Sequence, residues 1–304
     1  MINFLQNLID ALSLGSLYAL VALGIGLVFG VLRLVNFAHG DYITIGAYAL
    51  IVPSTDVTAR LFIGTWDWAA VISTICIIVV VVALITDALV YKRLRQATSP
   101  TLMIASFAVS FILQNGVLVV YGSRAKAVNL WPVLSTQISM GPLRFPMLQM
   151  VTIITTIVLM VALNAFLKFS PTGIRMRAAA EDFRMARLLG VKSSFVIGVA
   201  FGISGLLAAV VSLLYVSQSG ALTYTMGVPL ALFAFTAVVI GGMGSLVGAV
   251  VGGFVVGILI TMLQAYLPPG VRDFRDAFAF GVLVLVLLVR PSGLVPSKTL
   301  ITRV

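Results

Sequence analysis

Three polar residues close to the first apolar segment carry groups that can recognise a small solute. Asn36, His39 and Asp41 supply an amide, an imidazole and a carboxylate within six positions. Polar groups of this kind are costly inside a bilayer, so there they usually mark a functional path. Together with the amides of a helix start, they would suit a carboxylate or amide solute. The alternative is structural: Asp41 caps the helix that follows, and Asn36 and His39 lie at a hydrated membrane interface.

A charged segment at 171–191, PTGIRMRAAAEDFRMARLLGV, interrupts the apolar sequence. We predict one amphipathic helix here, capped by Thr172 and followed by Gly190. Its apolar stripe comprises Met176, Ala179, Ala180, Phe183, Ala186 and Leu189. The charged residues fall largely off that stripe and comprise Arg177, Glu181, Asp182, Arg184 and Arg187. Such a helix would dock into a groove of another protein or lie on membrane lipid; the alternative is a solvated loop helix.

Signatures of catalysis are missing from the sequence. It contains no G-x-x-x-x-G-K-[ST] phosphate loop, no H-E-x-x-H and no G-x-S-x-G. The single histidine excludes a multi-histidine metal site, and the single cysteine, Cys76, excludes a disulfide framework. We therefore expect neither catalytic residues, nor a metal site, nor a cofactor, and expect any ATP hydrolysis to reside in another chain.

The composition indicates the class of protein that positions these residues. Of the 304 residues, 61% are hydrophobic and only 9% are charged, whereas soluble domains carry about 25% charge. We predict an all-α, polytopic helical membrane protein. The net charge of +10 then reflects basic cytoplasmic loops and does not indicate a nucleic-acid partner.

Eight to nine apolar segments are predicted, and most are near the length of about 20 residues that crosses a bilayer. They are 8–32, a segment ending near 52, 67–91, 100–121, 147–167, 193–216, 227–243, 246–266 and 277–289. The lower number applies if one segment is re-entrant, which is tolerated where protein buries the backbone.

Basic residues predict the orientation of these segments. If the segment 170–192 is cytoplasmic, most of the 19 lysine and arginine residues fall on the cytoplasmic side. This places the N-terminus outside and the C-terminus in the cytoplasm. We expect residues 1–304 to form a single transmembrane permease domain with a cytoplasmic loop at 170–192.

Glycines recur every four residues near the end of the chain. Gly244, Gly248 and Gly252 form one series, and Gly253 and Gly257 repeat its spacing. A helix face without side chains permits close approach of a neighbour, so we expect a seam between helices rather than a moving gate.

Four stretches resemble the membrane subunits of branched-chain amino-acid ABC transporters, in particular the H-type subunit. They are NFAHGDYITIGAY (36–48), RAAAEDFRMARLLGV (177–191), VVIGGMGSLVGAVVGG (238–253) and LLVRPSGL (287–294). The second resembles the coupling loop of bacterial importers, whose pattern is E-A-A, three residues and then Gly. Ala186 and Gly190 keep this spacing, whereas Arg184 and Met185 stand where the pattern has Glu and Ala.

The resemblance implies an importer in the bacterial inner membrane. The complete complex would contain a second homologous membrane subunit, two ATP-binding subunits and an extracytoplasmic solute-binding protein. The residues expected to couple to the ATPase are Arg177, Ala180, Glu181, Asp182, Phe183, Ala186, Leu189 and Gly190.

Three alternatives remain open at this stage. The same class of importer also carries urea and short amides. A stand-alone secondary transporter would be expected to hold ionisable groups in the membrane, and Asp87 is the one acidic residue well away from a predicted segment end. A structural membrane scaffold would not need the segment that resembles a coupling loop.

Overall fold

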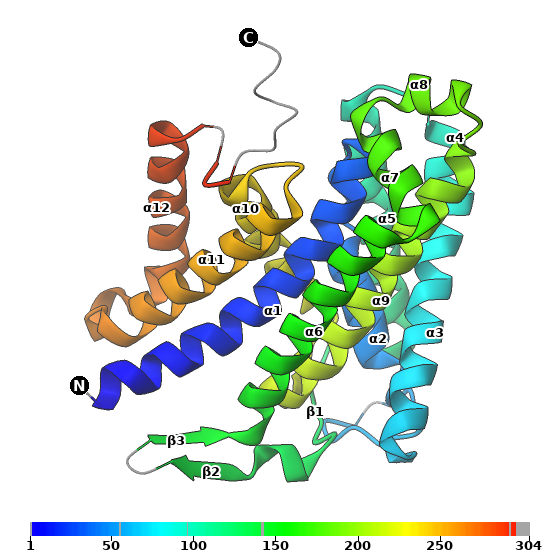
Figure 1. Ribbon diagram of the computed structural model, residues 1–304. Helices are drawn as coiled ribbons and strands as arrows, with labels where there is room; N and C mark the ends of the chain where they lie inside the picture. Colours follow the sequence, from blue (N-terminus) through cyan, green and yellow to red (C-terminus); the bar gives the residue numbers. More distant parts are fainter. Residues whose placement is uncertain (1, 55, 96, 141–142, 292, 296–304) are drawn as a thin grey trace. The chain divides into compact units, whose positions relative to one another are not determined.

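The computed structural model of the chain is mainly helical (Figure 1). It describes every residue except 1, 55, 96, 141–142, 292 and 296–304. The helices are α1 (Ile2–Leu32), α2 (His39–Tyr48), η1 (Ile63–Thr65), α3 (Trp68–Thr86), η2 (Asp87–Tyr91), α4 (Lys92–Leu94), α5 (Ser99–Tyr121), η3 (Pro132–Ser135), α6 (Met147–Phe169), α7 (Pro171–Glu181), α8 (Phe183–Leu188), α9 (Ser193–Ser219), α10 (Gly227–Gly241), α11 (Leu246–Tyr266), η4 (Pro269–Phe274) and α12 (Arg275–Val289). The short strands are β1 (Lys126–Ala127), β2 (Gln137–Met140), β3 (Leu143–Pro146) and β4 (Ala221–Leu222).

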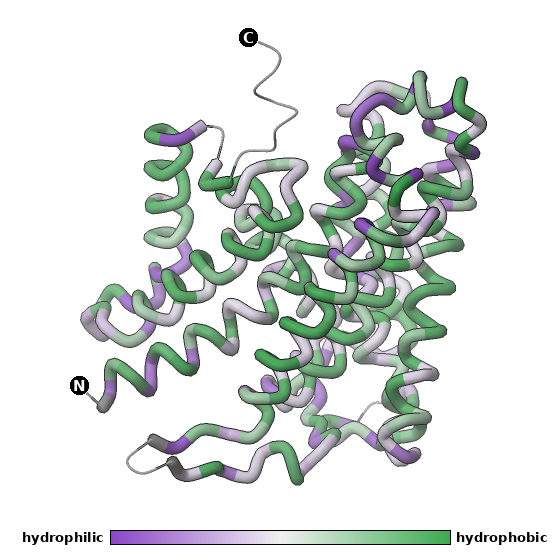
Figure 2. Tube along the Cα trace, viewed as in Figure 1, coloured by the Kyte–Doolittle hydropathy of each residue, from purple (hydrophilic) through white to green (hydrophobic). Residues whose placement is uncertain are grey.

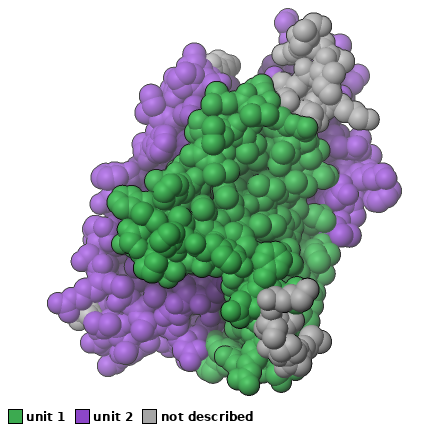
Figure 3. Space-filling view, turned by 90° about the vertical axis from the view of Figure 1, so that its left-hand side faces the viewer, with its two compact units in different colours: residues 1–26, 131–160, 232–304 green, residues 27–130, 161–231 purple. Residues whose placement is uncertain are grey.

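The chain divides into two compact units (Figure 3). Unit 1 comprises Met1–Gly26, Trp131–Met160 and Leu232–Val304, and unit 2 comprises Leu27–Leu130 and Val161–Ala231. Three of the four boundaries fall within α1, α6 and α10, so each of these helices contributes residues to both units.

Within the residues that the structure describes, six helices are long and apolar enough to cross a membrane, and the chain is a multi-pass membrane protein. They are Asn3–Leu32, Trp68–Leu94, Ser99–Tyr121, Met147–Phe169, Ser193–Ser219 and Leu246–Tyr266. All nine predicted apolar segments contain a helix, but α2 has 10 residues and α10 and α12 have 15 each. A helix of 15 residues is about 22 Å long, shorter than the roughly 30 Å hydrocarbon core. Among the described residues, six helices therefore have the length of a full span, and the predicted eight to nine crossings are not confirmed.

Small residues allow the helices of unit 2 to approach closely. Helix α2 lies against α3 and α9, and α3 runs along α9. A Cβ atom on Gly46 of α2 would lie 2.6 Å from the Ser212 Oγ of α9 and 2.9 Å from a methyl group of Val79 of α3. On α9, a Cβ atom on Gly205 would lie 2.9 Å from the Ala83 Cβ of α3. Glycine is therefore required at these crossings.

In unit 1 the glycines of α11 face two neighbours. Gly253 and Gly257 lie against Ala19 and Gly15 of α1. Gly248 and Gly252, on another face, lie against the backbone of α10 at Gly241 and Ala237. The predicted glycine seam is therefore confirmed. In the turn between α10 and α11, Gly244 has φ +89°, a conformation that favours glycine.

The connection 122–146 is more ordered than the sequence indicates. Strand β1 pairs antiparallel with β4, and β2 pairs antiparallel with β3.

Apolar residues follow the helices in Figure 2, and hydrophilic residues gather at the end of unit 2 that carries α4, α7 and α8. Unit 2 therefore has one strongly charged end and one end at which short strands join the loops.

Candidate functional site

The start of α2 is a buried polar turn rather than a hydrated interface. Asn36 and Asp41 are 1% exposed, and His39 is fully buried. The Oδ1 atom of Asn36 accepts from the Tyr91 hydroxyl at 2.8 Å and from the Ala38 N–H at 3.1 Å. The interpretation that water satisfies these groups at an interface is therefore wrong.

Asp41 does not cap α2, because it lies inside the helix. Helix α2 begins at His39, and neither carboxylate oxygen of Asp41 has a hydrogen-bond partner among the described residues. The amides at the helix start are also occupied: that of His39 donates to the Asn36 carbonyl, and those of Asp41 and Tyr42 donate to the Ala38 carbonyl. Three amides of the first turn are therefore not available to a ligand, whereas the side chains of His39 and Asp41 are.

The three predicted path residues share one turn but face three different elements. Asn36 meets Tyr91 of η2, and the His39 Nδ1 atom lies 2.9 Å from the Ser204 Oγ of α9. Asp41 lies near Ser110 and Gln114 of α5. The Nε2 atom of His39 is buried and has no partner in the described part of the chain. Unsatisfied polar groups thus remain at His39 and Asp41, where unpaired burial is costly.

The seam between α2 and α5 extends from Asp41 toward the end of both helices. The Tyr48 ring packs on Tyr121, with their centroids 4.9 Å apart. The Tyr48 hydroxyl is buried and, within the described residues, has no hydrogen-bond partner. The sequence alone interprets Gln114 as a hydrogen-bond partner between helices, and it does not single out Ser110. Both are polar residues inside an apolar helix, which is itself a signal of function.

The segment 170–192 forms two helices, not the single predicted one. Ser170, and not Thr172, caps α7, because its Oγ accepts from the Gly173 N–H at 2.9 Å. Asp182 has extended backbone angles and caps α8 by accepting from the N–H groups of Arg184 and Met185. Gly190 has φ +83° just past α8, as predicted for the end of a helix.

The break redistributes the predicted apolar stripe. Met176, Ala179 and Ala186 are buried within this chain, and Ala180 and Phe183 are half-buried. Of the other predicted coupling residues, Arg177, Glu181, Asp182, Leu189 and Gly190 are exposed. The exposed large apolar residues of α8 and its end are Met185, Leu188 and Leu189, at 57%, 78% and 83%. The surface open to a partner is therefore carried mainly by α8.

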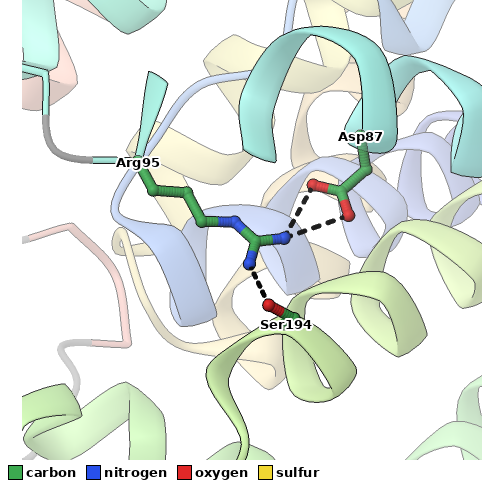
Figure 4. A network of polar contacts seen from close by, with 3 residues as sticks. All are labelled: Asp87, Arg95 and Ser194. Carbon is green, nitrogen blue, oxygen red and sulfur yellow. Dashed lines mark hydrogen bonds and ion pairs between the residues drawn. The ribbon is translucent and has the colours of Figure 1, made fainter. Parts of the chain in front are cut away.

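A polar network joins the end of α3 to the start of α9 beside this segment (Figure 4). One Arg95 nitrogen contacts both Asp87 carboxylate oxygens at 3.3–3.4 Å, and the other donates to the Ser194 Oγ at 2.7 Å. The Arg95 and Asp87 side chains are only 19% and 8% exposed. Asp87 is therefore paired within the chain, as expected for a structural ion pair rather than a lone membrane acid.

A comparison with known protein families covers most of the chain. A family model described as the permease component of the branched-chain amino acid transport system matches residues 7–287. The chain belongs to this permease family.

Curated relatives match almost the whole permease. It is 33% identical over 300 residues to the high-affinity branched-chain amino acid transport system permease protein LivH of Escherichia coli K12, covering 96% of this chain and 95% of the relative. It is 33% identical over 298 residues to BraD of Pseudomonas aeruginosa PAO1, with the same coverage. A probable branched-chain amino acid transport permease LivH of Methanocaldococcus jannaschii is 26% identical over 297 residues, covering 93% and 90%. These relatives are transport permeases, not enzymes, and no solved structure matches this chain.

The Arg95 network gives a prediction about stability. Arg95→Met leaves Asp87 buried without its cation, and removing one partner of a buried pair costs about 3–5 kcal/mol. We expect the free energy of unfolding to fall by that amount, measured on the purified permease in detergent. Arg93→Met changes an exposed residue of the same basic cluster and should have an effect of about 0.5 kcal/mol or less.

A double variant separates the charge effect from a general loss of side-chain contacts. Arg95→Met with Asp87→Leu removes both charges and should recover most of the stability that Arg95→Met loses. Equal instability of the single and double variants would contradict a role for the ion pair.

Proposed function

We propose that this chain is a membrane-spanning subunit of an ATP-binding-cassette importer for branched-chain or related small amino acids in the bacterial inner membrane. The observation that carries the proposal is the match of one permease family to residues 7–287, which includes both compact units. On this basis both units belong to one permease domain. The partners are a second homologous membrane subunit, two ATP-binding subunits and an extracytoplasmic solute-binding protein.

The orientation of unit 2 follows from which chain segments meet at each end. Residues near 51–61, 126–128 and 220–222 join by backbone pairing at one end. Tyr91 meets Asn36, and Arg95 meets Ser194, toward the other end. This alternation supports an extracytoplasmic side for the loop and strand contacts and a cytoplasmic side for 170–192.

We infer that the segment containing α2 is long enough to cross the membrane, although α2 itself is short. Its start, Asn36, contacts Tyr91 beyond the end of α3, and its end, Ile51, pairs with Leu61 just before α3 begins. Residues 36–51 therefore run the length of α3. We include this segment among the crossings, and counting the short helices α10 and α12 as well gives the nine that we propose.

In unit 1, backbone contacts indicate which helix ends lie on the same side. Successive contacts pair Gly15 with Gly257 and Ala19 with Gly253, so α1 and α11 run antiparallel. After α12, the N–H groups of Leu294 and Val295 donate to Ile240 and Gly241 at the end of α10. Within unit 1, α10 and α12 therefore end on one side, and α1 begins on the other. Arg290, just after α12, favours the cytoplasm for the first side, so we place the C-terminus inside and the N-terminus outside.

The buried polar turn of α2 suits a zwitterionic solute. In this proposal the amino acid passes along Asn36, His39 and Asp41, and the Asp41 carboxylate binds its ammonium group. A charged hydrogen bond contributes about 1.5–3 kcal/mol, and among the described residues no cation pairs with the buried carboxylate, which lies near the neutral side chains of Ser110 and Gln114. The aliphatic side chain requires only the apolar surroundings that the helices provide.

The segment 170–192 is proposed to dock on an ATP-binding subunit. Arg177, Glu181 and Asp182 supply exposed polar contacts, and α8 offers the apolar surface of Met185, Leu188 and Leu189. Phe183, half-buried at the start of α8, supports that surface from within the chain. Exposed apolar residues on a short helix framed by charges are typical of a helix that enters a groove.

Asp41 provides the test of the transport path. With the complete importer, we expect Asp41→Asn to lower initial leucine uptake roughly tenfold or more, because the charged hydrogen bond is lost. Asp56→Asn alters an acid that is 54% exposed and paired with Arg60, and it should retain uptake. Labelled leucine is measured in cells with matched permease levels.

Competing solutes test the proposed substrate class in the same cells. Unlabelled isoleucine and valine should reduce leucine uptake, whereas urea and acetamide should not. Inhibition by urea without inhibition by isoleucine would assign the importer to urea or short amides.

Coupling is tested on the exposed residues of α8. Leu188→Ala removes a large exposed side chain, and truncating a central contact residue of an interface often costs about 2 kcal/mol or more. We expect roughly thirtyfold weaker binding of the ATP-binding subunits, with uptake falling in parallel. Phe183→Ala should weaken binding as well, whereas Arg184→Ala should do much less.

The measurement is co-purification of the ATP-binding subunits at matched permease levels. Wild-type co-purification by both Leu188→Ala and Phe183→Ala would show that 170–192 is a solvated loop and not the coupling element.

A further inference from the structure

A cavity of about 600 Å³ lies at the end of the α2–α5 seam, in the loops after these two helices. It is lined by Pro53, Ser54, Val119, Val120, Tyr121, Gly122, Ser123, Arg124 and Lys126. One wall is apolar and aromatic, and the other carries two basic residues. The cavity belongs wholly to unit 2.

Lys126 is a buried cation in this wall. The residue is 1% exposed, and its Nζ donates to the backbone carbonyls of Ser54 and Asp56. An ammonium group has three donors, so one donor remains without a partner in the described part of the chain. Burial of a charge is costly unless it is paired, and among the described residues no carboxylate pairs with Lys126.

Two further polar residues line the same cavity. The Ser54 Oγ is buried and has no hydrogen-bond partner within the described residues, and the exposed Arg124 lines the cavity beside Lys126. The nearest acid in sequence, Asp56, is paired through its carboxylate with Arg60 at 3.8 Å. The wall therefore carries two cations and a hydroxyl group without a partner. Among the described residues, no carboxylate pairs with either cation.

We infer that this cavity binds the carboxylate group of the amino acid before it moves along α2. The inference rests on the proposed transport function and the proposed orientation, which place the cavity on the extracytoplasmic side. Lys126 and Arg124 would hold the carboxylate, Ser54 would donate a hydrogen bond to it, and Val119, Val120 and Tyr121 would cover an aliphatic side chain.

The position of the cavity relative to Asp41 indicates the order in which the two charged ends of the solute are bound. Tyr121 lines the cavity and packs on Tyr48, one helical turn or more beyond Asp41 on the same seam. A cationic site at the mouth and an anionic site deeper along α2 recognise opposite ends of a zwitterion. The carboxylate is bound first in this order, and the ammonium group is bound at Asp41 after the tyrosine pair is passed.

Thiol reactivity inside the cavity tests the inference. Cys76, the single cysteine of the chain, is replaced by Ala, and Ser123→Cys places a thiol in the cavity wall. In the reconstituted membrane complex without its binding protein, an anionic methanethiosulfonate should react roughly tenfold faster than a cationic one, relative to free cysteine. Arg124→Gln should reduce this preference, and Arg60→Gln, an exposed arginine outside the lining, should not.

Ligand protection identifies the group that is bound. Leucine and 4-methylpentanoate, which keep the carboxylate, should slow modification of Ser123→Cys at millimolar concentration. 3-Methylbutylamine, which lacks the carboxylate, should not, and Arg124→Gln should weaken protection by both carboxylates. Protection by the amine alone, or by inorganic chloride and sulfate as well as by leucine, would overturn the inference.

The remaining outcomes separate this site from the proposed function. Absence of protection by any carboxylate, with normal leucine uptake, would overturn the inference and reduce Lys126 to a clamp on the loop 53–58. Protection by carboxylates without uptake of any branched-chain amino acid would support the site and refute the proposed function. Lys126→Met is assayed as well, and loss of its expression does not affect the result for Arg124→Gln.

Discussion

The lack of water inside a bilayer is the constraint on which the rest of this structure depends. Polar groups there must find partners within the protein or serve a ligand. Asn36 meets the first condition, because Tyr91 and the Ala38 amide satisfy its carbonyl oxygen. Asp41 and the His39 Nε2 do not meet it among the described residues. Within this one turn, Asn36 therefore fixes the position of α2, whereas His39 and Asp41 can bind solute.

The π-helical turn η2 connects the polar start of α2 with the charged end of unit 2. Its last residue, Tyr91, holds Asn36, and its first, Asp87, holds Arg95, which reaches Ser194 at the start of α9. Helix α9 directly follows the segment 170–192 and contacts α7. Such π turns are frequent at functional sites. The residues beside the proposed path and those beside the proposed ATPase contact are thus positioned by five consecutive residues.

The sequence could predict the helices but not every contact between them. Long apolar runs identify α1, α3, α5, α6, α9 and α11, and four-residue glycine spacing identifies the α11 seams. The break at Asp182 was not predictable from apolar spacing, because it arises from a polar contact: the Asp182 side chain accepts hydrogen bonds from the first amides of α8 instead of continuing α7. From the sequence, Lys126 belongs to the polar connection 122–146. In the structure it lies in β1, which pairs with β4, and it is buried. Long-range pairing of this kind leaves no periodic signal in the sequence.

We propose that the two ends of unit 2 lie on opposite sides of the membrane, with 170–192 in the cytoplasm. Single cysteines at Ala125 and Lys192, both exposed, in a Cys76→Ala background test it most directly. With a membrane-impermeant thiol reagent, Ala125→Cys should be labelled in intact cells. Lys192→Cys should be labelled only after the inner membrane is permeabilised. Labelling of Lys192→Cys in intact cells, with Ala125→Cys protected, would contradict the orientation, the coupling role and the external position of the cavity together.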